Sequence, residues 1–115
     1  MKLAYVLGAW LLLVAGTSCA QAHARLQQSV PADGSTLTSA PAGLVLRFSE
    51  SVRLASLWIA REEGSRQKLV SPVEPQTKIA VALPPLVPGR YVVGWRAVAA
   101  DGHVVPGQIR FTLAR

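Results

Sequence analysis

The chain is 115 residues long, which suits a single domain, and half of its residues are hydrophobic, which excludes a chain that is disordered throughout. Its one cysteine excludes a disulfide framework and a cysteine-rich zinc or iron–sulfur site. The formal charge of +6 arises from 12 Lys and Arg against 6 Asp and Glu, and the basic residues are spread along the chain, so we expect a solvated basic surface and no nucleic-acid partner.

The first 22 residues are predicted to be a secretory signal peptide. Lys2 gives a short positive start, and residues 3–16 form an apolar run without a charge. That run has the length of a signal-peptide core and is too short for a comfortable membrane span. We therefore expect an exported protein from which the leader, residues 1–22, is removed.

The predicted cleavage site lies after Ala22, because small residues occupy the last and third-last positions of the leader. Cleavage there makes His23 the first residue of a mature domain that spans residues 23–115. Two other positions satisfy the same rule and would leave Gln21 or Arg25 first. A lipoprotein signal at Cys19 fits less well.

The predicted mature domain contains no sulfur. When 22 of the 115 residues are removed, 93 remain, and they include neither Cys nor Met. No thiolate or thioether is then left to build a Cu(I) site, and no sulfur is left to oxidise in an oxidising compartment.

The pattern of the mature domain predicts short strands separated by turns. Apolar residues alternate with polar or small ones in five stretches: 44–48, 54–61, 79–83, 91–99 and 109–113. Gly, Pro, Asp and Ser cluster between these stretches, and no stretch has a helical period. This spacing predicts an all-β fold, an antiparallel β-sandwich. Trp58 and Trp95 fall within strand patterns and are expected in its core.

The two histidines of the mature domain are its most informative residues. The α-amino nitrogen and ring Nδ1 of an N-terminal His23 could chelate one metal ion, and His103 could add a third nitrogen. Asp101 lies two residues before His103, so in an extended segment it faces the same side and could add an oxygen. Three nitrogens and one oxygen favour Cu(II), although Zn(II) could use the same donors in a tetrahedral arrangement.

Each of these motifs also has an ordinary explanation. Asp101-Gly102 is a common turn, and a histidine after it is often a solvated loop residue. A histidine beside a leader cleavage site can be accidental. The conjunction of the two motifs is stronger than either alone, because it gives both histidines one task.

Motifs along nearly the whole mature domain resemble the CopC family of periplasmic copper-resistance proteins. The matching segments are His23-Ala24-x-Leu26, Ser29-Val30-Pro31-Ala32-Asp33-Gly34-Ser35, Ala40-Pro41, Leu44-x-Leu46-x-Phe48-Ser49-Glu50, Pro88-Gly89-x-Tyr91-x-Val93-x-Trp95-Arg96, Asp101-Gly102-His103 and Gly107-x-Ile109-x-Phe111-Thr112. Their order and spacing are far more specific than any one of them.

The resemblance implies a Greek-key β-barrel or sandwich, cupredoxin-like or Ig-like, that holds one Cu(II) per chain. It implies that His23, Asp101 and His103 are the ligands, and that Glu50 lies near the site, at most as an axial ligand or a neighbour of the ligands. An exposed carboxylate at a strand end is an equally good interpretation of Glu50. The implied protein is periplasmic, buffers copper and passes it to an inner-membrane partner of the CopD type, in resistance or homeostasis. The sequence leaves the oligomeric state open, with a monomer as the default expectation.

The chain departs from the family pattern in one region. Some members carry a second, methionine-rich Cu(I) site in a middle loop, but residues 65–77 here contain neither Met nor His. The chain therefore resembles a Cu(II)-only member.

Two other functions are compatible with the sequence. One is a metal-free, Ig-like interaction domain of the cell envelope. The other is a copper monooxygenase with a histidine brace, which is less favoured because the chain is short and Asp101 would fill the position that oxygen needs. We expect no enzyme, because four protein donors around copper leave little room for a substrate.

Overall fold

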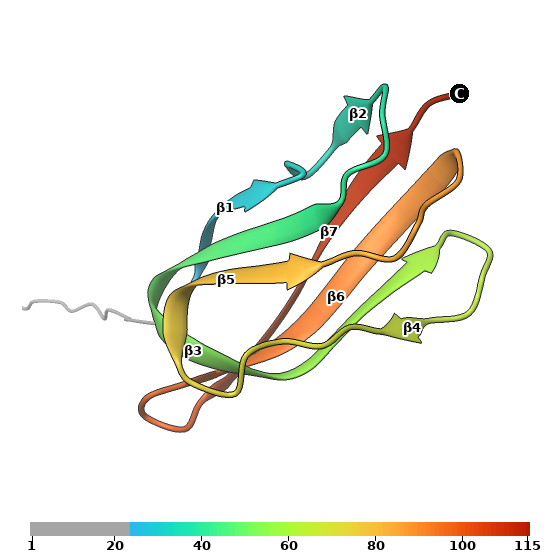
Figure 1. Ribbon diagram of the computed structural model, residues 1–115. Helices are drawn as coiled ribbons and strands as arrows, with labels where there is room; N and C mark the ends of the chain where they lie inside the picture. Colours follow the sequence, from blue (N-terminus) through green and yellow to red (C-terminus); the bar gives the residue numbers. More distant parts are fainter. Residues whose placement is uncertain (1–23) are drawn as a thin grey trace, which may run out of the picture.

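The computed structural model describes residues 24–115, which form an all-β domain with a curled sheet and no helix in that range (Figure 1). Its seven strands are β1 (Leu26–Val30), β2 (Ser35–Leu37), β3 (Gly43–Arg61), β4 (Gln67–Lys68), β5 (Gln76–Ala82), β6 (Gly89–Ala99) and β7 (Val104–Leu113). Among residues 24–115 there is consequently no helix with the length and apolar character needed to cross a bilayer.

Strand β3 organises the fold because it belongs to both layers. In its first half, Val45 opposes β1 on one side and β5 on the other. In its second half, Trp58 opposes β4 on one side and β6 on the other. Between the halves the strand bends sharply, and its register with β5 shifts between Arg47 and Val52 (Figure 1). Such an irregularity lets a strand leave one layer and enter the next.

The core lies between these two layers. Side chains at alternate positions of every long strand are buried, as a sheet with one face on a core requires. Phe48 from the first half of β3 meets Trp95 of β6 edge to face, with ring centroids 6.0 Å apart. The largest fully buried side chains are Phe111, Leu44, Leu46, Leu57, Ile79, Ile109, Val52 and Val93. Burial of this apolar surface supplies the main driving force for folding.

The predicted all-β sandwich is confirmed, with two refinements. The stretches 44–48 and 54–61 belong to one continuous strand, β3, and all five predicted strand segments are present. One pairing is parallel rather than antiparallel, because β2 lies beside the edge of β7, with Ser35 opposite Phe111. The sheet is therefore mixed.

The two tryptophans have different environments. Trp95 is 4% exposed and belongs to the core, as predicted. The prediction for Trp58 is wrong, because its neighbours Leu57 and Ile59 point into the core and Trp58 points to the outer face. Its ring lies across Gly94 of β6, in the space that a Cβ would need, and the Arg66 guanidinium sits 4.0 Å from the ring centroid. A backbone without a side chain thus provides the flat site on which this ring packs.

Candidate metal centre

The β6–β7 hairpin positions two of the predicted ligands. The strands pair up to Val98 and Val104, and the Ala99 N–H donates to the His103 carbonyl at 2.9 Å. The Gly102 N–H donates back to the Ala99 carbonyl at 2.9 Å. Gly102 has a φ of +91°, which a residue with a side chain adopts only at a cost. This tight connection holds Asp101 and His103 at the tip of a long, well-paired hairpin.

Asp101 and His103 contact each other directly. One carboxylate oxygen, Oδ1, accepts the His103 backbone N–H at 3.0 Å, and the other, Oδ2, lies 2.8 Å from His103 Nδ1. This contact favours the tautomer in which Nδ1 carries the proton, since a carboxylate is an acceptor. A metal bound by this imidazole would then be held through Nε2. The carboxylate would orient the ring, as it does in many metal sites.

These hydrogen bonds also hold the pKa of the Asp101 carboxyl below its usual value. The backbone N–H of His103 is the main cause, and the His103 side chain is the second. Both interactions favour the ionised form. Their contribution to stability is present above the ordinary pKa and is lost as the pH falls through the lowered one. The carboxylate is therefore available as an anionic group throughout the neutral range.

The start of the described chain is fixed at the bend of β3. Ala24 is fully buried, and the Arg25 N–H donates to Ser49 Oγ at 2.9 Å. In return, the Ser49 N–H donates to the Arg25 carbonyl at 2.8 Å. We call this pair of hydrogen bonds the Arg25–Ser49 bracket. It ties the residues that follow position 23 to the corner where β3 changes layer.

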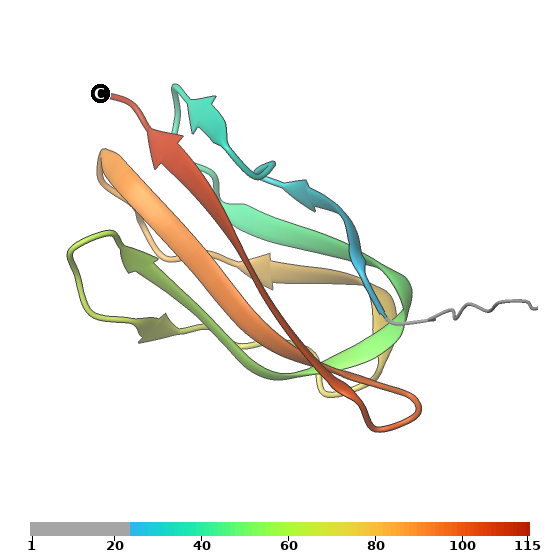
Figure 2. The ribbon, with the colours of Figure 1, turned by 180° about the vertical axis from the view of Figure 1, so that it is seen from behind.

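The bracket and the β6–β7 hairpin lie at the same end of the domain. Val52, three positions after Ser49, pairs with Ala99, and the hairpin tip begins directly after Ala99. Antiparallel pairing therefore places the tip beyond Val52, toward Ser49. Figures 1 and 2, seen from opposite sides, both show the first coloured residues and the hairpin at this end. Sequence positions almost eighty residues apart thus converge.

The predicted site residues have different outcomes. Asp101 and His103 are brought together, and His23 lies outside the described residues. Glu50 is half-buried at the bend of β3. Within residues 24–115 no group of three or more His, Cys, Asp or Glu side chains is placed to hold a metal ion, so Glu50 does not complete a cluster with the hairpin pair.

Sequence reasoning missed the Arg25–Ser49 bracket. Ser49 belongs to the segment Phe48-Ser49-Glu50, which carried part of the family resemblance, but its hydroxyl had no assigned contact. Serine is common in many settings, and nothing in its spacing indicates a partner 24 positions earlier. The fold alone brings the two together.

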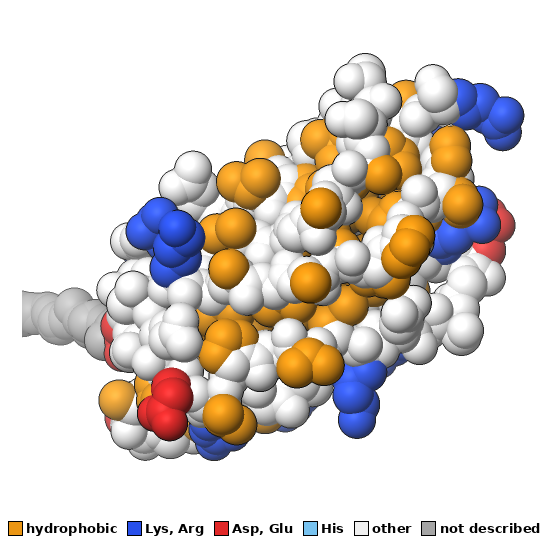
Figure 3. Space-filling model, in the orientation of Figure 1, with side chains coloured by type: hydrophobic (Ala, Val, Ile, Leu, Met, Phe, Trp, Pro, Cys, Tyr) orange, Lys and Arg blue, Asp and Glu red, His pale blue; other side chains and the backbone are white. Residues whose placement is uncertain are grey.

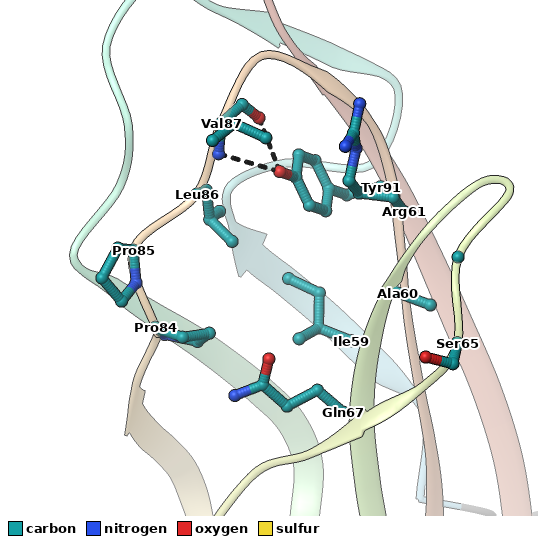
Figure 4. A pocket seen from close by; sticks show the side chains of 11 residues that line it. Ile59, Ala60, Arg61, Ser65, Gln67, Pro84, Pro85, Leu86, Val87 and Tyr91 are labelled. Carbon is teal, nitrogen blue, oxygen red and sulfur yellow. Dashed lines mark hydrogen bonds between the residues drawn. The ribbon is translucent and has the colours of Figure 1, made fainter.

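A cavity lies toward the opposite end of the domain. About 220 Å³ in volume, it lies between the end of β3, the turn that leads into β4 and residues 84–87, and Tyr91 lines it as well (Figure 4). The Tyr91 hydroxyl donates to the Val87 carbonyl and accepts the Val87 N–H at 3.1 Å. The lining of this cavity has no His, Cys, Asp or Glu, so it offers no set of metal ligands.

The face of the domain seen in Figure 3 is largely apolar. Hydrophobic side chains gather across it, with charged side chains at its margins.

Comparison with known proteins found a matching family model and several sequence relatives. The family model of the CopC domain matches residues 26–114. Copper resistance protein C of Pseudomonas syringae pv. tomato is 34% identical over 106 residues, which cover 83% of this chain and 83% of that protein. Protein YobA of Escherichia coli strain K12 is 29% identical over 107 residues, 80% of this chain and 79% of that one.

Solved structures agree with these sequence relatives. The crystal structure of CopC from Methylosinus trichosporium OB3b matches with a TM-score of 0.71 and 27% identity, over 80% of this chain and 94% of that one. PcoC, a methionine-rich copper resistance protein from Escherichia coli, matches with a TM-score of 0.58 and 30% identity, over 80% and 99% of the two chains.

Proposed function

The chain belongs to the CopC family, and from that premise we propose that it is an exported protein that binds Cu(II) and passes it on. Several of its relatives are named for copper resistance, and solved structures of CopC and PcoC share the fold. The observation that carries the proposal is the pairing of Asp101 with His103 at the end of the domain where the described chain begins.

Maturation creates the first part of the proposed site. Removal of residues 1–22 frees the α-amino group of His23, which becomes a ligand together with its own ring Nδ1. The amine has an ordinary pKa of about 7.7–8.0, so a divalent ion can displace its proton near neutral pH. The Arg25–Ser49 bracket supports this proposal because it holds the next residues beside the hairpin.

The hairpin supplies the second part. His103 contributes Nε2, and the Asp101 carboxylate contributes an oxygen or orients the imidazole. One copper binds per chain, as Cu(II), because sites built from nitrogen and oxygen donors bind Cu(II) more tightly than the other divalent ions of the first transition row. The chain has no methionine after Met1, so it offers no thioether for the Cu(I) site that some relatives carry. Glu50 is at most an axial or neighbouring group.

The exposure of the site suits transfer rather than catalysis. The side chains of His103 and Asp101 are 68% and 58% exposed, so an acceptor protein could approach the ion without opening the fold. We propose that the protein acts as a monomer in the periplasm and delivers copper to an inner-membrane partner of the CopD type. It serves copper resistance or homeostasis and performs no chemistry of its own.

Two variants of the mature protein test this proposal. His103→Ala removes one ligand, and a chain extended by one residue before His23 moves the amine away from the chelate. Each should weaken Cu(II) binding by about 100-fold or more in a competition titration, because loss of an orienting neighbour alone costs 10- to 100-fold. Both should keep the β-rich circular dichroism spectrum of the unaltered protein. Unchanged affinity in either variant would contradict the corresponding ligand assignment.

A further inference from the structure

The Arg25–Ser49 bracket is unusual because the hydroxyl of Ser49, and not its backbone carbonyl, accepts one of the two hydrogen bonds. Leu26 opposes Phe48 in the β1–β3 ladder, so Arg25 opposes Ser49. In a hydrogen-bonded pair of a regular antiparallel ladder, the two opposed residues exchange two N–H···O=C bonds. Here the Ser49 N–H donates to the Arg25 carbonyl as expected, but the Arg25 N–H donates to the Ser49 hydroxyl. One of the two bonds therefore depends on which residue occupies position 49.

The bend of β3 explains why the Ser49 hydroxyl, and not the Ser49 carbonyl, accepts the Arg25 N–H. Ser49 lies in the break between Arg47 and Val52, where β3 leaves the register of its first layer. A strand that turns away carries its carbonyl out of line with the neighbouring strand. The short hydroxyl of serine reaches the donor at this point, and threonine has the same group. Alanine keeps the Ser49 N–H bond and loses the other.

The hydroxyl acts on the second peptide unit after the proposed copper ligand His23. The Arg25 nitrogen belongs to the Ala24–Arg25 peptide, whose plane is rigid, and Ala24 is buried with 0% exposure. One further peptide unit, about 3.8 Å between Cα atoms, separates Ala24 from position 23. Fixing this peptide therefore limits where the terminal residue can be placed.

We propose that Ser49 is a positioning residue for the copper site, and this inference rests on the proposed function. Its hydroxyl holds the Ala24–Arg25 peptide, which limits where the amine and ring of His23 can lie relative to the hairpin ligands Asp101 and His103. A chain terminus that is ordered before binding loses less conformational entropy when the chelate closes. Ser49 does not touch the metal, and its effect is carried through the backbone.

The test compares three variants of the mature protein. Ser49→Ala should weaken Cu(II) binding by roughly 3- to 10-fold, the range expected for one hydrogen bond. Ser49→Thr should restore affinity, because residue 49 is exposed and an added methyl group has room. Ser51→Ala, an exposed serine two positions along the same strand, is the matched control and should leave affinity unchanged.

A second background separates positioning from a general effect on folding. In the chain extended by one residue before His23, the amine no longer takes part and only the His23 ring still depends on this peptide, so Ser49→Ala should cause a clearly smaller loss of Cu(II) affinity than in the mature protein. An equal loss in both backgrounds, or no loss in the mature protein, would overturn the role of Ser49. If the extension and His103→Ala themselves leave affinity unchanged, the proposed function fails instead, so the two failures are distinguishable.

Discussion

In the proposed copper site, Asp101 orients His103 before any metal binds. Both of its carboxylate oxygens engage His103, one through the backbone N–H and one through Nδ1. The first contact fixes the hairpin tip, and the second fixes the orientation and tautomer of the ring. A ligand that is oriented in advance binds its ion with less loss of rotational freedom.

Replacing Asp101 by Asn tests this orientation. The substitution keeps the size of the side chain but removes its charge, so both the bond to Nδ1 and any direct ligation weaken. We expect Cu(II) affinity to fall by about 10- to 100-fold in a competition titration. Glu63→Gln removes the same charge from an exposed turn. It should change affinity by less than about twofold, because salt screens the interaction between distant, exposed charges. Equal losses in the two variants would show that only net charge matters.

Gly102 provides the positive φ that the turn of the same hairpin requires. Alanine has open space there, but it must adopt a φ of +91°, at a cost of about 1 kcal/mol. For a domain of this size, that cost lowers Tm by roughly 4–8 °C. Gly64→Ala is the control, since its nearest atom lies at an ordinary 3.6 Å and its φ is outside the left-handed region. Thermal unfolding followed by circular dichroism should show a loss in the first variant only.

At the scale of elements, the bent strand β3 connects the two layers, and the proposed site lies at the end of the domain where β3 bends. The outer face of its second half has a specific packing: Trp58 covers Gly94, and Arg66 covers Trp58. The ring occupies the space that any side chain at position 94 would need. This cross-strand stack therefore depends on the glycine as much as on the two larger residues.

Gly94→Ala should displace the Trp58 ring and destabilise the domain by about 1–3 kcal/mol, as overpacking does. Chemical denaturation would measure the loss. In a Trp58→Ala background, where the ring is gone, the same change at position 94 should cost much less. Additive losses in this double-mutant cycle would mean that the ring does not restrict position 94.

The long strands could be predicted from the sequence because each buries one complete face. Alternation along 79–83, 91–99 and 109–113 is sustained, and β5, β6 and β7 follow it. Strands β2 and β4 have only three and two residues, too few for a period to be visible. Trp58 was misplaced because an aromatic residue in a strand usually faces the core, and the space above Gly94 exists only once β3 and β6 are paired.

At the scale of the whole molecule, the core and the proposed site are separate. The buried aromatic and aliphatic side chains lie between the layers, whereas Asp101 and His103 are exposed at one end. Folding without copper is therefore expected, in contrast to small domains whose core is completed by a metal.

Copper should stabilise this folded domain by mass action. At a free Cu(II) concentration 100 times the Kd, stability should rise by about 2.7 kcal/mol, which corresponds to a Tm increase of roughly 10 °C or more. A chelator should reverse the shift, and the apo protein should keep a cooperative transition. A Tm that does not respond to copper would favour the metal-free interaction domain.

The convergence of the site could not be predicted from spacing. Asp101 and His103 are two positions apart, so they were predicted to face the same side of an extended segment, and in the structure a turn brings them together. Position 23 lies eighty residues before His103, and only the β1–β3–β6 pairings bring the two regions to one end. The family resemblance suggested that convergence, whereas the contact of Ser49 with Arg25 could be seen only in the structure, because it depends on where a bent strand places one hydroxyl.

The most direct test of the central claim is an electron paramagnetic resonance spectrum of the copper-loaded mature protein, recorded with natural and ¹⁵N-labelled histidine. If the His23 amine, the His23 ring and His103 Nε2 all bind, the spectrum should be that of a single tetragonal Cu(II) with hyperfine coupling to three nitrogens, and labelling should change that coupling. A spectrum without nitrogen coupling, or one that histidine labelling leaves unchanged, would contradict it.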